Sequence, residues 1–199
     1  IDSSLANSYA SHVLRGGPLH IHYSSVVSSR HLLNGPSFTV NLVRGFTRLR
    51  QIYWCFIETS DNTKKKARDF KSPVAQAFTV DSDAYNWQVT IGSRRWPERH
   101  CQGVAESFMR LRQASASFYG TDDLSVGVAG YTSNQFIGGL DLEKVGHQGA
   151  THSGLSTRDG SITAFEVNNS GMQAGDTLMI FLVYDGLLSI KDGACEVFE

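Results

Sequence analysis

The chain has 199 residues, of which 41% are apolar and 19% are charged, with 18 Lys and Arg against 19 Asp and Glu. This composition is typical of one globular domain or two small ones and excludes wholesale disorder. The near-neutral charge argues against sequence-specific nucleic-acid binding, and no run approaches the roughly 18 apolar residues of a membrane-spanning helix.

The first residues, Ile-Asp-Ser-Ser, include no initiator Met and no signal peptide. We therefore expect the chain to be an internal piece of a longer polypeptide. The three cysteines, Cys55, Cys101 and Cys195, are far apart and odd in number, so they do not form a disulfide framework. The sequence predicts that they are buried free thiols and that the protein is made in a reducing compartment.

Alternation of apolar and polar residues with a period of two runs through much of the chain. It occurs in residues 19–23, in residues 38–42 and most clearly in residues 85–91. Such alternation predicts strands with one buried face. Residues 52–57 and 178–184 are more continuously apolar, which is typical of strands covered on both faces. Shorter strands are predicted in residues 165–167, 186–190 and 132–140, the last one broken at Gly138 and Gly139.

One segment has helical periodicity instead. Val104, Phe108, Leu111 and Ala114 are spaced by three or four residues, which predicts one amphipathic helix over residues 103–117. With about eight strands, this one inserted helix and long connections at 60–83 and 146–160, the sequence predicts an all-β fold. The long connections favour a jelly-roll (Greek-key) sandwich over an up-and-down barrel.

Charge is distributed unevenly along the chain. Residues 1–100 contain 13 basic and 7 acidic residues, a net +6, whereas residues 101–199 contain 5 and 12, a net −7. Either the two halves interleave in one fold, or the surface offers complementary faces to identical neighbours. Lys64, Lys65 and Lys66 form the densest basic stretch, which reads as a solvated loop.

The strongest candidate for a metal site is the pair His20 and His22, because side chains two residues apart on a strand lie on one face. No carboxylate follows at a suitable spacing, so we interpret both as polar surface residues. We likewise interpret His147 and His152 as loop residues. The sequence contains no nucleophile elbow, dinucleotide motif or phosphate-binding loop, and so predicts neither an enzyme nor a cofactor.

Arginine and tryptophan are enriched where subunits touch, which draws attention to Arg94, Arg95 and Trp96 after the clearest strand. Trp96 fits a lid on the core equally well. Together with Arg110 and Arg112 on the predicted helix, these residues are the candidates for subunit contacts.

The order of features resembles a known family. A strand at residues 46–53 leads into a basic loop, then come Trp87-Gln88-Val89-Thr90-Ile91-Gly92-Ser93 and Arg94-Arg95-Trp96-Pro97, the helix with Ala105-Glu106-Ser107-Phe108-Met109-Arg110-Leu111, and a terminal strand pair at 176–190. This is similar to the C-terminal jelly roll of double-jelly-roll major capsid proteins of polinton-like viruses, adintoviruses, virophages and related DNA viruses. Such proteins have two jelly rolls, whereas residues 1–199 suffice for one.

The resemblance implies a structural protein that forms trimeric, pseudo-hexameric capsomers of an icosahedral virion capsid. Its partners would be identical subunits, neighbouring capsomers and penton or minor capsid proteins. Two alternatives stay open at this point. One is a jelly-roll module that binds a carbohydrate or another ligand, and the other is a cupin-like enzyme that uses His20 and His22.

Overall fold

The computed structural model describes residues 3–58, 70–74, 84–119, 125–143, 154–158, 163–191 and 194–198. Its elements, in chain order, are α1 (Ser3–Leu14), β1 (Leu19–Leu32), β2 (Phe38–Leu42), β3 (Leu49–Ile57), β4 (Asn86–Ile91), β5 (Arg94–Gln102), α3 (Gly103–Tyr119), α4 (Val128–Tyr131), β6 (Gly138–Asp141), β7 (Thr163–Asn168), β8 (Thr177–Lys191) and β9 (Ala194–Phe198).

Eight of the strands form four nested antiparallel pairs. β1 pairs with β8, β2 with β7, β3 with β6, and β4 with β5, as if one long hairpin had been folded back at its middle. When this hairpin is rolled up, it gives two sheets with the strand orders β1-β8-β3-β6 and β2-β7-β4-β5. This winding is a jelly roll, so the predicted fold is confirmed.

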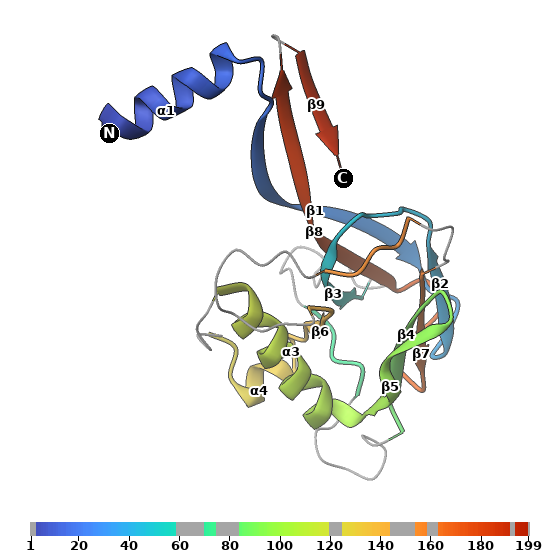
Figure 1. Ribbon diagram of the computed structural model, residues 1–199. Helices are drawn as coiled ribbons and strands as arrows, with labels where there is room; N and C mark the ends of the chain where they lie inside the picture. The colour runs from blue at the N-terminus through green and yellow to red at the C-terminus, as the bar shows by residue number, and fades with distance from the viewer. Residues whose placement is uncertain are drawn as a thin grey trace.

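The two sheets and α3 enclose an aromatic core, which is the lower part of Figure 1. Trp54 on β3 and Trp87 on β4 meet with their ring centroids 4.6 Å apart, and Phe165 on β7 lies 4.8 Å from Trp54. All three side chains are fully buried. The alternation predicted in residues 85–91 is confirmed, because Tyr85, Trp87 and the apolar residues that follow face this core.

The predicted helix is confirmed as α3, and it packs against β6. Val104, Leu111 and Ala114 are buried on its inner face, as expected from their spacing. Two hydrogen bonds fix the helix to the sandwich. Trp87 Nε1 donates to Ser107 Oγ at 2.9 Å, and Gln51 Nε2 donates to the carbonyl oxygen of Ala114 at 3.0 Å.

Gly138 and Gly139 do not break a strand, as the sequence suggested, but are the first two residues of β6, and the predicted residues 132–137 belong to no strand. A Cβ on Gly138 would lie 2.0 Å from the indole ring of Trp54, and one on Gly139 would lie 3.0 Å from Leu111. Both glycines are therefore needed for close packing rather than for a turn.

The two strands predicted in residues 178–190 are one strand, β8. Asp185 and Gly186 look like a turn in sequence, but each has a partner that keeps it in the ladder. Asp185 accepts a hydrogen bond from Ser24 on β1, and Gly186 lies where any Cβ would be 2.5 Å from the ring of Tyr23.

The sequence did not predict α1 or α4, and it indicated β9 only through the strand-like run around Cys195. Residues 94–99, read as the exit of a strand, belong to β5, the outermost strand of its sheet. Pro97 is tolerated there because an edge strand has one side free of ladder hydrogen bonds. Cys55 and Cys101 are buried as predicted, whereas Cys195 is exposed, because β9 pairs with β8 alone.

Candidate assembly surface

One part of the molecule projects from the jelly roll. We call it the arm, and it consists of α1, residues 19–24 of β1, residues 185–191 of β8, and β9 (Figure 1). β3 pairs with β8 only as far as Tyr184, and β9 pairs with β8 from Leu187 onward. The arm is therefore a β-ribbon with a helix attached, and the second sheet does not extend beneath it.

The arm exposes apolar side chains that a globular body would bury. Leu14 is 87% exposed, Leu5 64% and Val197 56%. Large apolar residues that are exposed on the arm are Leu5, Tyr9, Leu14, Ile21, Val197 and Phe198. Surface apolar residues are normally scattered singly, so their concentration on one projecting part marks an interaction surface.

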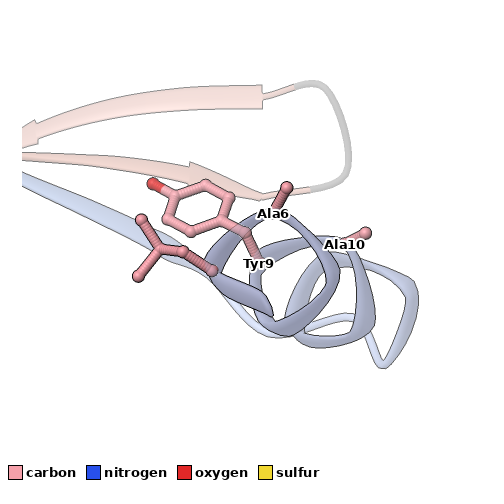
Figure 2. Close-up of a pocket in the computed structure, with 4 residues that line it drawn as sticks. Ala6, Tyr9 and Ala10 are labelled. Atoms are coloured by element: carbon pink, nitrogen blue, oxygen red, sulfur yellow. The ribbon is translucent and has the colours of Figure 1, made fainter. Parts of the chain in front are cut away.

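The helix α1 carries a shallow apolar pocket. Leu5, Ala6, Tyr9 and Ala10 line it, and Figure 2 shows the side chains of Ala6, Tyr9 and Ala10 along the helix. Leu5 and Tyr9 are four residues apart, as are Ala6 and Ala10, so a row of large side chains runs beside a row of small ones. This arrangement forms a ridge and a groove on one face of α1.

The exit from α1 is fixed by two glycines. Gly16 has a φ of +73°, which favours glycine, and the N–H of Gly17 donates to the carbonyl oxygen of His12 at 3.1 Å. Nε2 of His12 lies 3.1 Å from the carbonyl oxygen of Pro18. The direction in which the helix leaves the ribbon is thus determined locally.

The arm joins the jelly roll at a cluster of charged residues. Arg50 of β3 forms ion pairs with Glu143 and with Asp185 of β8, the latter with Nη1 and Oδ1 3.2 Å apart. Oγ of Ser24 on β1 donates to the same Asp185 oxygen at 2.6 Å. The carboxylate-bearing side chains are nearly buried, with exposures of 6% for Glu143 and 4% for Asp185.

A β-bulge aims Arg50 at these partners. The register between β3 and β8 shifts between Leu49 and Gln51, so Arg50 is the extra residue. Burial alone would lower the pKa of Arg50, but the hydrogen bonds and charges of Glu143 and Asp185 raise it above its ordinary value. The guanidinium therefore stays charged and links three strands where β8 leaves β3.

The five predicted contact residues lie outside the arm, at two places. Arg94 and Arg95 are exposed beside the two-residue turn between β4 and β5, and the adjacent Trp96 is half-buried against the core. Arg110 lies on α3, where its Nη2 is 3.1 Å from Oε1 of Glu106, and Arg112 is exposed on the same helix. That these residues contact other subunits stays a prediction.

The other candidate sites from the sequence are the histidines and the basic stretch. His20 and His22 are exposed on β1 within the arm. Among the residues that the structure describes, no group of three or more His, Cys, Asp or Glu side chains is placed to bind a metal ion. His147, His152 and the lysines at 64–66 lie outside the described residues. The described helices include none that is long and apolar enough to cross a membrane.

The titratable groups with large pKa shifts belong to the core. Burial raises the pKa of Cys55 to about 11 and that of Cys101 to about 12, so both thiols are protonated and unreactive at neutral pH. Burial also raises the pKa of the Tyr85 and Tyr131 hydroxyls. These shifts reflect the dry interior rather than a cleft open to a substrate.

The sequence could have revealed part of the arm. Leu187, Leu188 and Ile190 continue the apolar run of β8 beyond the body, and Leu5 with Tyr9 already has helical spacing. The exposure of these residues could not be read from the sequence, because it depends on where β3 ends its pairing with β8.

Comparisons with solved structures find the same architecture in other proteins. PBCV-1 VP54, fitted into a reconstruction of the virophage Sputnik, matches 99% of the chain with a TM-score of 0.56 and 8% sequence identity. A quasi-atomic model of the PBCV-1 virus capsid matches 99% with a TM-score of 0.55 and 9% identity. Each match covers 54% of the other chain, so this chain spans about half the length of these structures.

Sequence comparisons add nothing to this result, since neither a family model nor a curated protein matches the chain. At 8% and 9% identity the structural likeness shows a shared fold. The chain therefore has the jelly-roll fold that the sequence resemblance predicted, and it shares this fold with a protein of the PBCV-1 capsid.

Proposed function

We propose that this chain is a structural capsid protein, namely one jelly roll of a double-jelly-roll major capsid protein. The observation that carries the proposal is that 99% of the chain superposes on structures from a viral capsid. In this proposal residues 1–199 form a single jelly-roll domain of a longer polypeptide. The twofold greater length of the matched chains supports that reading.

The make-up of the described residues supports a structural role rather than an enzymatic one. The largest pKa shifts belong to buried core groups, and six of the eleven exposed large apolar side chains among the described residues lie on the projecting arm. A protein whose task is to touch copies of itself needs such surfaces more than it needs a cleft. No feature of the described residues favours the alternative of a carbohydrate- or ligand-binding module.

The finer proposal is a homotrimer. Three subunits with two jelly rolls each would give a capsomer with a hexagonal outline, and such capsomers would tile the shell of the virion together with penton or minor capsid proteins. The buried thiols Cys55 and Cys101 are compatible with synthesis in a reducing host compartment, cytoplasm or nucleus. Arg94, Arg95, Trp96, Arg110 and Arg112 are the proposed contacts between jelly rolls.

Negative-stain images and mass photometry of the purified native protein test this proposal. We expect trimers with a hexagonal outline, and larger closed particles at high concentration. A monodisperse monomer at high micromolar concentration would contradict it. Arg94→Glu combined with Arg95→Glu should reduce the trimer fraction, whereas Arg158→Glu, at an exposed arginine elsewhere, should not. Equal trimer fractions would remove these two arginines from the interface and leave the capsid role untouched.

A further inference from the structure

We propose that α1 is a docking helix that packs against α1 of a second copy of this chain. The inference rests on the proposed function and deepens it, because it names the part of the arm through which one copy binds another. It is carried by the exposed apolar face of α1 and by the shape and charge of that face.

The exposure of α1 is the first argument. Every described side chain of this helix is exposed, including Leu5 and Tyr9. A helix of 12 residues is marginal in water on its own, and helices of this length are normally stabilised by packing of an apolar face. No other described element packs closely along α1, as Figure 1 shows. A partner that covers the apolar face would therefore stabilise the helix as well as the contact.

The shape of the face is the second argument. The ridge of Leu5 and Tyr9 lies beside the groove above Ala6 and Ala10. When two such helices pack antiparallel, the ridge of each can enter the groove of the other. The same surface then serves both partners, which is what a twofold contact between identical chains requires.

The charge of the face is the third argument, and it favours a second copy over a charged partner. α1 contains no Asp, Glu, Lys or Arg. A contact between identical surfaces brings like groups together, so a charged face would repel itself, whereas a neutral face does not. A charged partner, in contrast, would find no complementary charge on this helix.

The test compares self-association of the full 199-residue chain with that of three variants by sedimentation velocity over a concentration series. Tyr9→Glu places a charge on the ridge, and Ala10→Leu fills the groove without adding charge or lowering helix propensity. Val43→Glu is the matched control, because Val43 is 97% exposed but lies outside the arm. We expect both α1 variants to raise the dissociation constant by about tenfold or more and the control to leave it unchanged.

The outcomes separate this inference from the proposed function. If the native chain associates and both α1 variants associate equally well, the docking helix is wrong and the capsid role stands. If the native chain is a monomer at all concentrations, the docking helix is wrong, and the trimer test on the longer native protein decides the capsid role separately. Unchanged melting temperatures of the variants would show that the body is intact. Binding of the chain to neutral phospholipid vesicles without self-association would assign α1 to a membrane surface and would also overturn the inference.

Discussion

Strand β8 runs through both the arm and the rest of the jelly roll, which we call the body, but its surroundings differ between these two regions. In the body, residues 177–184 of β8 are mostly buried between β1 and β3 and face the aromatic core. In the arm, the same strand continues with Leu187, Leu188 and Ile190, which are half-exposed. The apolar character of β8 therefore extends beyond the sandwich that could bury it. The comparison teaches that the body buries its own apolar side chains, whereas the arm leaves part of its apolar surface exposed.

The two regions also differ in how their elements are held together. The body is held by rings in contact, with Trp54 touching both Trp87 and Phe165. The point where the arm begins is held by charges, with Arg50 between Glu143 and Asp185. Apolar packing tolerates little change in volume, whereas a buried ion pair is sensitive to the loss of one partner. Substitutions in the two regions should therefore destabilise the protein for different reasons.

The largest effect is expected for Trp54→Ala in the body. The indole of Trp54 is fully buried at the centre of the core, so its removal leaves a cavity that the facing sheets cannot close. The free energy of unfolding should fall by about 3–5 kcal/mol, measured by urea denaturation. Trp96→Ala is the control, because Trp96 is half-buried on the edge strand β5 and should cost markedly less. Equal losses at the two sites would mean that the core is not centred on Trp54.

A somewhat smaller effect is expected for Arg50→Met at the base of the arm. Without Arg50, the nearly buried carboxylates of Glu143 and Asp185 both lose the guanidinium with which they form ion pairs. The free energy of unfolding at pH 7 should fall by about 3 kcal/mol. Unpaired buried carboxylates have raised pKa values, so the variant should regain stability relative to the native protein as the pH falls and they become protonated. The same loss at pH 4 as at pH 7 would show that Arg50 acts through packing alone.

The body was predictable from the sequence to a large extent. The alternation in residues 85–91 and the helical spacing of Val104 and Leu111 each follow from a local period, and the structure has the strand and the helix that they predict. The nesting of the strand pairs rested on the resemblance and on the long connections rather than on any single motif. Gly138 was misread because its requirement comes from the ring of Trp54, which is remote in sequence.

The arm was less predictable, for physical reasons. Four of the 12 residues of α1 are Ser, which competes for backbone hydrogen bonds, and its first turn has no acidic residue, so its sequence carries weak helix signals. Asp185 and Gly186 look like a turn until their partners on β1 and β3 are known. For the candidate site, the sequence directed attention to arginines and Trp96, whereas six of the eleven exposed large apolar side chains among the described residues lie on the arm. The exposure of a strand residue depends on where the neighbouring strands end, and this cannot be predicted from the spacing of apolar residues along the chain.

A modest effect on stability is expected for Glu106→Gln at the start of α3. Burial would raise the pKa of Glu106, but the backbone N–H of Gln102 and the side chain of Arg110 lower it below its ordinary value. The ionised carboxylate therefore stabilises the fold above about pH 4.5, and this contribution is lost as the pH falls through the lowered folded-state value. The native protein should exceed the variant by about 0.5–1 kcal/mol in free energy of unfolding at pH 7 and by almost nothing at pH 3. A difference that persists at pH 3 would assign the role of Glu106 to packing.

The smallest effect is expected for Leu14→Ser at the end of α1, and it is the strictest check of the comparison between body and arm. Leu14 is 87% exposed, so its side chain loses almost no buried area in a monomer. In dilute solution, where copies are apart, the free energy of unfolding should change by less than about 0.5 kcal/mol. A loss above about 1 kcal/mol under those conditions would mean that α1 packs on its own jelly roll. If the variant instead matches the native protein when dilute but is less stable when concentrated, the missing stabilisation belongs to the contact between copies, because only association depends on concentration.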